Sequence, residues 1–287
     1  MKTLVSPIFY MGNKSKLVKK GLTDLFPSNI DTFYDLFCGS GTVAINTKAN
    51  KLILNDIDNN TIELIKFFKY NSPNYVLDKI CGYINLYQLP TFSTDARTFK
   101  GDREIYKTKY NKLREDYNIS RSIELLYVLN IFSNSHMLRY NKFGEFNMPF
   151  GNGYFTDKCK QSISDNVYKD VTELHNKHYT DFLNVDFNID DFVYLDPPYY
   201  NTTATYTENG GWGIEQEQEL HTFCEQLNSK GVKFALSNTF SNKGIENTQL
   251  IDWVTKNGYN VHFFDNFTYS SCGKGNAKTV EVLITNY

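Results

Sequence analysis

The chain has 287 residues, with 30 basic and 32 acidic side chains and a formal net charge of -2. That length suits one large domain, or one domain that carries an insertion. Hydrophobic residues make up 41% and charged residues 22%, which excludes global disorder. The balance of charge also excludes a uniformly basic surface for nucleic acid, although it allows a local basic patch.

Nothing in the sequence predicts a membrane or secretory segment. No apolar run approaches the roughly 18 residues of a membrane-spanning helix. Pro7, Gly12 and three lysines interrupt the first 17 residues before an apolar stretch of signal-peptide length forms. The five cysteines are scattered and contain no Cys-x-x-Cys pair. This pattern favours a reducing, cytoplasmic location, and it predicts neither a disulfide framework nor a metal site.

Apolar runs alternate with helical patterns along much of the chain. The runs that predict strands buried on both faces are 32–37, 51–56, 182–187, 191–196 and 232–238. Helical patterns lie between them at 61–70 and 215–231. The alternation predicts an open α/β sheet. Near the C-terminus, 262–269 and 278–287 flank a glycine-rich loop and predict an antiparallel hairpin that closes the sheet.

The middle of the chain has a different composition. It contains two basic, aromatic segments with a helical pattern, at 103–117 and 121–132. A segment rich in glycine and asparagine follows at 139–155. Asn141-Lys-Phe-Gly144, between alternating aromatic residues, predicts a hairpin turn. We interpret 61–159 as an inserted domain, and 1–60 with 160–287 as the domain that holds the sheet.

The first motif with chemical content is Asp35-Leu-Phe-Cys-Gly-Ser-Gly41, which follows the first predicted strand. Its glycines allow a tight turn and a close approach of the backbone to a ligand. No Gly-Lys-Ser/Thr follows, so it is not a phosphate-binding P-loop. The second strand ends at Asp56, a position at which an acid can bind a ribose diol. Taken alone, each feature also suits an ordinary turn.

The second motif is Asp196-Pro-Pro-Tyr199, directly after another predicted strand. A chance match of these four residues in a chain of this length is about one in a thousand. The prolines fix φ and donate no N–H, so their carbonyls point outward. A carboxylate and a carbonyl can accept two hydrogen bonds from an exocyclic amino group, while Tyr199 stacks on its ring. The alternative is a rigid loop with a buried aspartate.

The third motif is Phe9-Tyr-Met-Gly-Asn-Lys14. Tyr10 offers an aromatic face, and Lys14 offers a donor for a carboxylate. Read alone, this segment is as consistent with a surface turn.

Together, the three motifs with an insertion between them resemble the Dam-type (D12) DNA adenine-N6 methyltransferases. The segment Arg139-Tyr-Asn-Lys-Phe-Gly-Glu-Phe-Asn-Met-Pro-Phe-Gly151 is similar to the RxNxxGxFNxPFG of the branch that recognises GATC. The likeness covers nearly the whole chain. It implies a Rossmann-like, doubly wound methyltransferase sheet with an inserted target-recognition domain of helices and a hairpin. It also implies a site-specific, adenine-specific DNA methyltransferase.

The resemblance implies S-adenosylmethionine as methyl donor, S-adenosylhomocysteine as product, and no metal. The cofactor-binding residues that it implies are Tyr10, Lys14, Asp35, Phe37, Cys38, Gly39, Ser40, Gly41, Thr42, Asp56, Asp186, Phe187, Asp196 and Tyr206. The catalytic residues that it implies are Asp196, Pro197, Pro198 and Tyr199. Because N6 of a stacked adenine cannot reach a donor, the base must flip out of the duplex.

The partner implied is double-stranded DNA, with no membrane and no obligate protein partner. The DNA-binding residues implied are Arg121, Asn134, Met137, Arg139, Asn141 and Pro149. A guanidinium such as that of Arg139 can read guanine in the major groove. The alternative for Arg139 is a phosphate contact, which positions DNA without reading it. A restriction–modification role and a phage role both stay open.

Two other functions stay open. One keeps the donor but methylates N4 of cytosine or a protein side-chain amide; the insertion argues against the amide, which needs no base-reading hairpin. The other is a DNA-binding regulator without catalysis. The intact Asp196-Pro-Pro-Tyr199 argues against it, because a pure binding protein has no use for that acceptor geometry.

Overall fold

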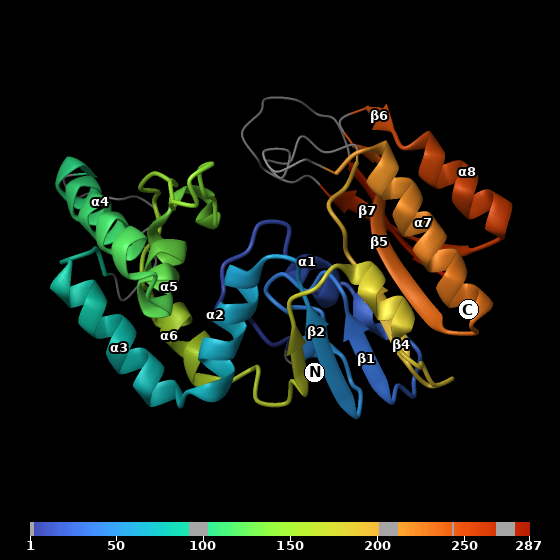
Figure 1. Ribbon diagram of the computed structural model, residues 1–287, viewed down its shortest axis with the longest axis horizontal. Coiled ribbons are helices and arrows are strands. Elements are labelled where there is room, and N and C mark those ends of the chain that lie inside the picture. The colour runs from blue at the N-terminus through green and yellow to red at the C-terminus, as the bar shows by residue number, and fades with distance from the viewer. Residues whose placement is uncertain (1–2, 92–102, 201–211, 243, 268–278) are drawn as a thin grey trace. The chain divides into compact units, whose positions relative to one another are not determined.

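The computed structural model describes residues 3–91, 103–200, 212–242, 244–267 and 279–287 (Figure 1). The chain forms two compact units. The helical unit consists of Met1–Lys19, Gly39–Asn46 and Asp58–Leu174. The sheet unit consists of Lys20–Cys38, Thr47–Ile57 and His175–Tyr287. No helix within the described ranges is long and apolar enough to cross a membrane.

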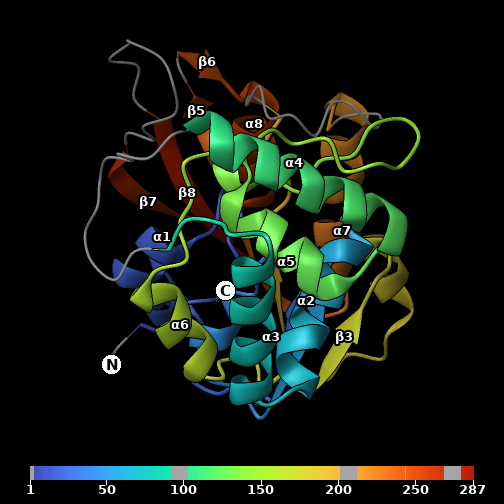
Figure 2. The same cartoon turned by 90° about the vertical axis from the view of Figure 1, so that its left-hand side faces the viewer.

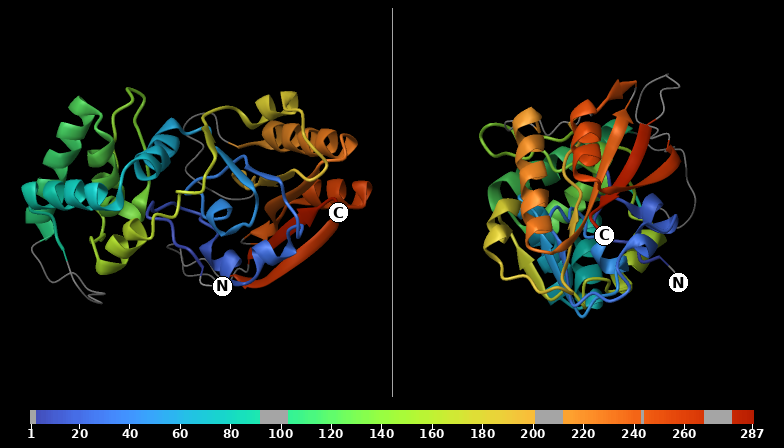
Figure 3. Two further views of the ribbon diagram at one scale, coloured as in Figure 1. Left: turned by 90° about the horizontal axis from the view of Figure 1, so that it is seen from below. Right: turned by 90° about the vertical axis from the view of Figure 1, so that its right-hand side faces the viewer.

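The sheet unit is organised around a mostly parallel sheet of order β3-β2-β1-β4-β5-β8-β7. Its strands are β1 (Thr32–Asp35), β2 (Lys51–Asn55), β4 (Phe192–Leu195), β5 (Lys233–Asn242), β6 (Ile245–Glu246), β7 (Asn260–Phe267) and β8 (Thr279–Thr285), and β3 (Glu173–His175) lies at the boundary of the units. Strands β2, β1, β4 and β5 pair in parallel, whereas β8 is antiparallel to β5 and β7. The red strands β7 and β8 lie side by side in Figure 3.

The sheet is buried on both faces, as its continuous apolar strands predicted. On one face, Tyr34 and Val193 belong to a core that α7 (Ile214–Ser229) and α8 (Thr248–Asn257) cover. On the other face, the Phe26 ring packs on Phe33 and Phe192, with centroids 5.9 and 4.9 Å away. Phe26 follows the short 3-10 helix η1 (Leu22–Leu25). The expected α/β sheet and the C-terminal antiparallel pair are therefore confirmed.

One predicted strand, 182–187, was wrong. The chain instead forms a 3-10 helix, η4 (Tyr179–Asn184), that ends within that run. Tyr179 and Phe182 are three residues apart, a spacing that places both on the same side of a 3-10 helix, and both are buried. An apolar run this short does not distinguish a buried strand from a buried helical turn.

The helical unit surrounds one apolar helix. Its elements are α1 (Ser15–Lys19), η2 (Ala44–Asn46), α2 (Asn59–Tyr70), α3 (Pro73–Leu86), α4 (Arg103–Ser120), α5 (Ile123–Phe132), η3 (Asn134–His136) and α6 (Asp157–Ser164). All of α5 from Leu125 to Phe132 is buried, because α2, α3 and α4 pack around it (Figure 2). The Ser122 hydroxyl caps α5 by accepting from the Leu125 N–H. The predicted helices at 61–70, 103–117 and 121–132 are confirmed.

The hairpin predicted around residue 141 is also confirmed. Tyr140 and Phe146 form an antiparallel bridge. The Asn141 carboxamide oxygen accepts from the N–H groups of Phe143 and Glu145, at 2.9 and 3.0 Å. Asn118 on α4 holds the returning strand, because its side chain accepts from the Phe146 N–H and donates to the Phe146 carbonyl. The residues interpreted as an insertion, 61–159, lie inside the helical unit.

Beyond the hairpin, Gly151 and Gly153 pass against the carboxyl end of α5. A Cβ at Gly151 would lie 2.5 Å from the Ser133 carbonyl oxygen. A Cβ at Gly153 would overlap the Ile131 carbonyl oxygen. This close approach of two backbones requires glycine at both positions.

We predict that Gly153→Ala lowers the free energy of unfolding by about 2 kcal/mol or more, because backbone must move to admit the methyl group. Urea denaturation measures this change. Gly82→Ala is the matched control: Gly82 lies inside α3 with no neighbour within 4 Å of its missing Cβ, and the change should stabilise the protein by about 1 kcal/mol. Unchanged stability of Gly153→Ala would contradict the packing.

Candidate functional site

Within the sheet unit, the strand order reverses between β1 and β4. Strand β2 follows β1 on one side, and β5 follows β4 on the other. Ligands of α/β sheets bind at the carboxyl ends of the strands on either side of such a reversal. Asp35 pairs in register with Tyr194, so the segments that follow β1 and β4 leave the sheet side by side.

The segment after β1 is fixed to the end of β2. The Cys38 N–H donates to the Asn55 carbonyl at 2.9 Å, and the Asn55 side chain donates to the Leu36 carbonyl at 3.0 Å. Asp56 comes next along the chain and is buried, as is Asp35. The structure therefore brings predicted residues Asp35, Cys38 and Asp56 together at the carboxyl edge of the sheet.

Aromatic rings cluster around Phe37 in the same unit. Phe37 lies 5.0 Å from the ring of Tyr179 and 5.8 Å, edge to face, from that of Trp212. Phe187 is half-buried and packs edge to face on Tyr34 at 5.1 Å, whereas its neighbour Asp186 is exposed. The predicted pair Asp186 and Phe187 is thus next to β1, with only the aromatic ring packed into the core.

Asp196-Pro-Pro-Tyr199 follows β4 as predicted. Pro197 is buried, and the half-buried Asp196 accepts a hydrogen bond from the Tyr199 hydroxyl at 3.1 Å. Burial, reinforced by the nearby charge of Asp196, raises the pKa of Tyr194 far above its ordinary value, so Tyr194 is neutral and shares a hydrogen bond with Ser237. A carboxylate has about four acceptor sites. The bond from Tyr199 therefore orients the Asp196 carboxylate.

In the helical unit, a hollow of about 190 Å³ contains three of the predicted cofactor residues, Tyr10, Ser40 and Thr42. The hollow is lined by Val5, Ser6, Ile8, Phe9, Tyr10, Asn13, Ser15, Ser40, Thr42, Ser135 and His136. Hydroxyl and amide groups thus stand beside aromatic faces, a mixture typical of small-molecule sites. Lys14 is buried and donates to the Gly12 carbonyl at 3.1 Å.

The glycine-rich loop beside this hollow needs its glycines. Gly39 and Gly41 have φ of 48° and 64°, the left-handed region that favours glycine. A Cβ at Gly39 would also lie 2.7 Å from the Tyr10 ring, so that ring lies against the loop. The Tyr168 hydroxyl donates to the Ser40 carbonyl at 2.8 Å. Nothing in the sequence pointed to Tyr168, because it lies 128 residues from its partner.

The predicted DNA-binding residues fall into two groups of the helical unit. At the hairpin, Arg121 donates to the Gly144 carbonyl at 2.8 Å, the Arg139 Nε donates to the Asn147 side chain at 2.8 Å, and the Asn141 side chain builds the turn. At η3, the Asn134 N–H donates to the carbonyl of the exposed Pro149 at 2.9 Å. Met137 comes directly after η3 and is half-buried.

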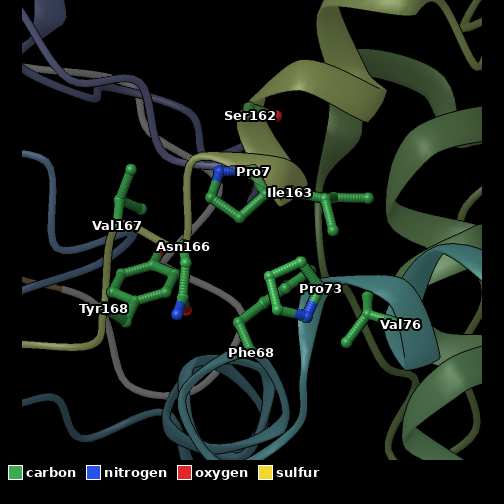
Figure 4. A pocket seen from close by; sticks show the side chains of 9 residues that line it. All are labelled: Pro7, Phe68, Pro73, Val76, Ser162, Ile163, Asn166, Val167 and Tyr168. Atoms are coloured by element: carbon green, nitrogen blue, oxygen red, sulfur yellow. The ribbon is translucent and has the colours of Figure 1, made fainter.

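Tyr206, predicted to contact the cofactor, lies outside the described residues. In the described ranges, no group of three or more His, Cys, Asp and Glu side chains could hold a metal ion. A second hollow, around Pro7, Phe68 and Tyr168, has a volume of about 10 Å³ (Figure 4), room for about one water molecule.

Known proteins with similar sequences support a single family. The family model for D12 class N6 adenine-specific DNA methyltransferases matches residues 10–266. The modification methylase StsI of Streptococcus sanguinis is 35% identical over 100% of this chain and 43% of its own length. The type II methyltransferase M.FokI of Planomicrobium okeanokoites is 35% identical over 98% of this chain and 43% of its own length. A DNA adenine methylase of Serratia marcescens is 28% identical over 78% of this chain and 77% of its own length. This chain therefore spans less than half the length of the first two relatives.

No motif in the sequence pointed to the buried carboxyl group that lies behind Phe37. Glu217 on α7 is completely buried and accepts hydrogen bonds from the side chains of Trp212, Asn238 and Asn247, at 2.8, 3.1 and 3.2 Å. Burial raises the pKa of the Glu217 carboxyl above its ordinary value of 4.5, although the three hydrogen bonds from these neutral donors oppose the rise. Trp212 donates to Glu217 and packs edge to face on Phe37. Glu217 therefore helps to fix the aromatic rings around Phe37.

A carboxyl whose pKa is higher in the folded chain stabilises the fold when it is protonated. That contribution is complete below pH 4.5 and is lost as the pH rises through the folded pKa. Glu217→Gln imitates the protonated state and does not titrate. As the pH increases, the unfolding free energy of the variant should therefore rise relative to that of the wild type, by at most about 1.4 kcal/mol per pH unit. Urea denaturation between about pH 5 and pH 8 measures this trend. The exposed Glu215→Gln is the control, and a difference that is constant with pH would contradict the prediction.

Proposed function

The chain belongs to the D12 class N6 adenine-specific DNA methyltransferase family, and on that premise we propose that it transfers a methyl group to N6 of adenine in duplex DNA. The observation that carries the proposal is Asp196-Pro-Pro-Tyr199 at the carboxyl end of β4, with an oriented carboxylate beside the reversal of strand order. The donor in this proposal is S-adenosylmethionine, which becomes S-adenosylhomocysteine. No metal is needed.

The residues of the chain suit that donor in two respects. The loop at Gly39 has no room for a Cβ, so glycine allows the Tyr10 ring to pack on the loop that would hold the donor. The carboxyl edge of β2 ends in the buried Asp56, which can accept from a ribose diol. Lys14 would pair with the donor carboxylate, and Phe187 would lie against its adenine. When bound, the donor supplies a methyl group on a positively charged sulfur.

The protein acts on the acceptor nitrogen. The lone pair of adenine N6 is delocalised into the ring, which makes the amino group a poor nucleophile. Asp196 and the Pro197 carbonyl would accept its two hydrogens and so localise the lone pair toward the methyl group. Tyr199 would stack on the flipped base. The nitrogen loses one proton on methylation, and either Asp196 or water takes it. Alignment and fixed dipoles supply most of the acceleration.

We propose GATC as the target sequence. The support is the segment from Arg139 to Gly151, whose hairpin the structure contains. The two 35% identical relatives are named a modification methylase and a type II methyltransferase, whereas the relative from Serratia named DNA adenine methylase is 28% identical. A second candidate is therefore another adenine-containing sequence, in a restriction–modification system. Either activity belongs in the cytoplasm, where double-stranded DNA is the partner.

The experiment that tests the function is transfer of labelled methyl groups to duplexes with and without GATC, followed by nucleoside analysis. Label in N6-methyladenine of the GATC duplex alone supports both proposals. Label in N6-methyladenine of other duplexes keeps the activity and rejects GATC. Label in N4-methylcytosine, or in protein alone, rejects adenine as the acceptor.

Asp196→Ala should reduce the rate of methyl transfer at least about a thousandfold, because the acceptor of the amino hydrogens is lost. DNA affinity, measured by fluorescence anisotropy, should stay within about threefold of the wild type, because Asp196 reads no sequence. Asp190→Ala is the matched control: Asp190 is exposed just before the amino end of β4, and its loss should leave turnover unchanged. Substantial turnover by Asp196→Ala would refute the role of Asp196.

Arg139 allows the two ways of binding DNA to be separated. Its Nε is held by Asn147, which leaves the two terminal nitrogens as a fork for guanine O6 and N7. Arg139→Lys keeps the charge and loses the fork. We expect it to lose about 1–3 kcal/mol of discrimination at one base pair, measured as kcat/KM on singly substituted duplexes. If Arg139→Lys still discriminates between the duplexes, and only Arg139→Ala binds DNA more weakly, Arg139 contacts a phosphate instead.

A further inference from the structure

A buried asparagine joins two distant segments of the helical unit. Asn130, near the carboxyl end of α5, has no exposed surface. Its carboxamide oxygen accepts from the Phe9 N–H at 3.0 Å. Its amide nitrogen donates to the carbonyls of Phe9 and His136, both at 2.9 Å. Both of its N–H groups and its oxygen are thus engaged with backbone groups of other segments.

The same two segments meet a second time through their rings. The His136 ring stacks on Phe9 with centroids 4.4 Å apart and planes at 18°. Its Nδ1 is 3.0 Å from the Asn130 carbonyl oxygen. Ser135 and His136 both have φ of 56°, a conformation that costs non-glycine residues about 1–3 kcal/mol and persists only when its surroundings hold it. The contacts with Phe9 and Asn130 help to hold it, together with the bond from the Asn134 N–H to the Pro149 carbonyl.

These contacts place residues with two different expected tasks next to one another. Phe9 precedes Tyr10, which is expected to contact the methyl donor, and both line the 190 Å³ hollow. Ser135 and His136 line the same hollow, and they lie between Asn134 and Met137, which are expected to contact DNA. A ligand in the hollow therefore touches the turn from 134 to 137 directly.

We propose that Asn130 is a positioning residue that couples occupation of this hollow by the methyl donor to the conformation of the DNA-reading turn 134–137. The inference rests on the proposed function. Donor bound against Phe9 and His136 stabilises the strained turn, and the turn so held binds the correct duplex more tightly. Because coupling between two binding sites is reciprocal, cognate DNA tightens donor binding by the same factor.

The coupling is measured as the ratio of two dissociation constants of the duplex, the one without a ligand in the donor site divided by the one with the donor site filled. The duplex is the one that the wild-type protein methylates best, and the donor site is filled with sinefungin, which carries no transferable methyl group. For the wild type, sinefungin should tighten binding of that duplex about fivefold or more. It should tighten binding of a duplex with one changed base pair much less, because only the correct site uses the turn.

Asn130→Asp is the main variant. An ionised aspartate still accepts from the Phe9 N–H, but it cannot donate to the carbonyls of Phe9 and His136. The ratio should fall to about 1, while each ligand alone still binds. His136→Asn is the second variant, since asparagine tolerates positive φ and removes only the ring stack and the Nδ1 contact. It should lower the ratio even if Asn130→Asp fails to fold, which its thermal denaturation midpoint reveals.

Asn118→Asp is the matched control. Asn118 holds both backbone groups of Phe146 just as Asn130 holds those of Phe9, but it touches the hairpin and not the donor segment. It should weaken DNA binding and leave the ratio unchanged. A ratio lost equally in Asn118→Asp would overturn the role of Asn130, because the loss would then reflect general loosening of the unit.

The outcomes separate this inference from the proposed function. A wild-type protein that binds neither sinefungin nor duplex would reject the proposed function itself. A wild-type ratio of 1 with both ligands bound would overturn the coupling and leave the function standing. A normal ratio in a folded Asn130→Asp would also overturn it.

Discussion

The parallel register between β1 and β4 is the constraint on which the sheet unit depends. Asp35 lies opposite Tyr194, and the ladder continues one step further, where the Leu36 N–H donates to the Tyr194 carbonyl at 3.1 Å. The register places Tyr34 and Val193 together in the core under α7. A slip of one residue would turn every side chain of the strand to the opposite face. The same register therefore determines both the packing of the core and the position of Asp196 beside the segment after β1.

Where no strand is available as a partner, this protein fixes backbone with asparagine side chains. The Asn55 side chain bonds to Leu36 and Lys177, as Asn118 does to Phe146 and Asn130 does to Phe9. A carboxamide carries both a donor and an acceptor, so one side chain can bond to a backbone N–H and to a backbone carbonyl at once. Replacing it with an apolar residue would leave buried polar groups unsatisfied, at about 1–3 kcal/mol each. The loops of the candidate site are thereby held in place.

Several elements followed from local patterns alone. Runs that are apolar on every residue indicated strands covered on both sides, and β1, β2, β4 and β5 form there because helices and loops cover both faces of the sheet. The turn at Asn141 followed from turn chemistry that acts over only a few residues. The same reasoning failed at 182–187, where burial and not periodicity decides between strand and helix. The positions of Asp196 and Gly39 were also readable, since proline and glycine fix backbone geometry locally.

By itself, the sequence determined the class of fold, the family of the chain and the three motifs whose residues we propose to carry the chemistry. Each depends on neighbours a few positions apart. Only the tertiary structure decided that Asn130 binds Phe9, 121 residues away, and that Glu217 lies buried among neutral donors beneath Phe37. A polar residue within a helix looks the same in the sequence whether it faces water or a distant backbone. Its partner is chosen by packing, because a buried polar group must find its hydrogen bond wherever the fold brings one.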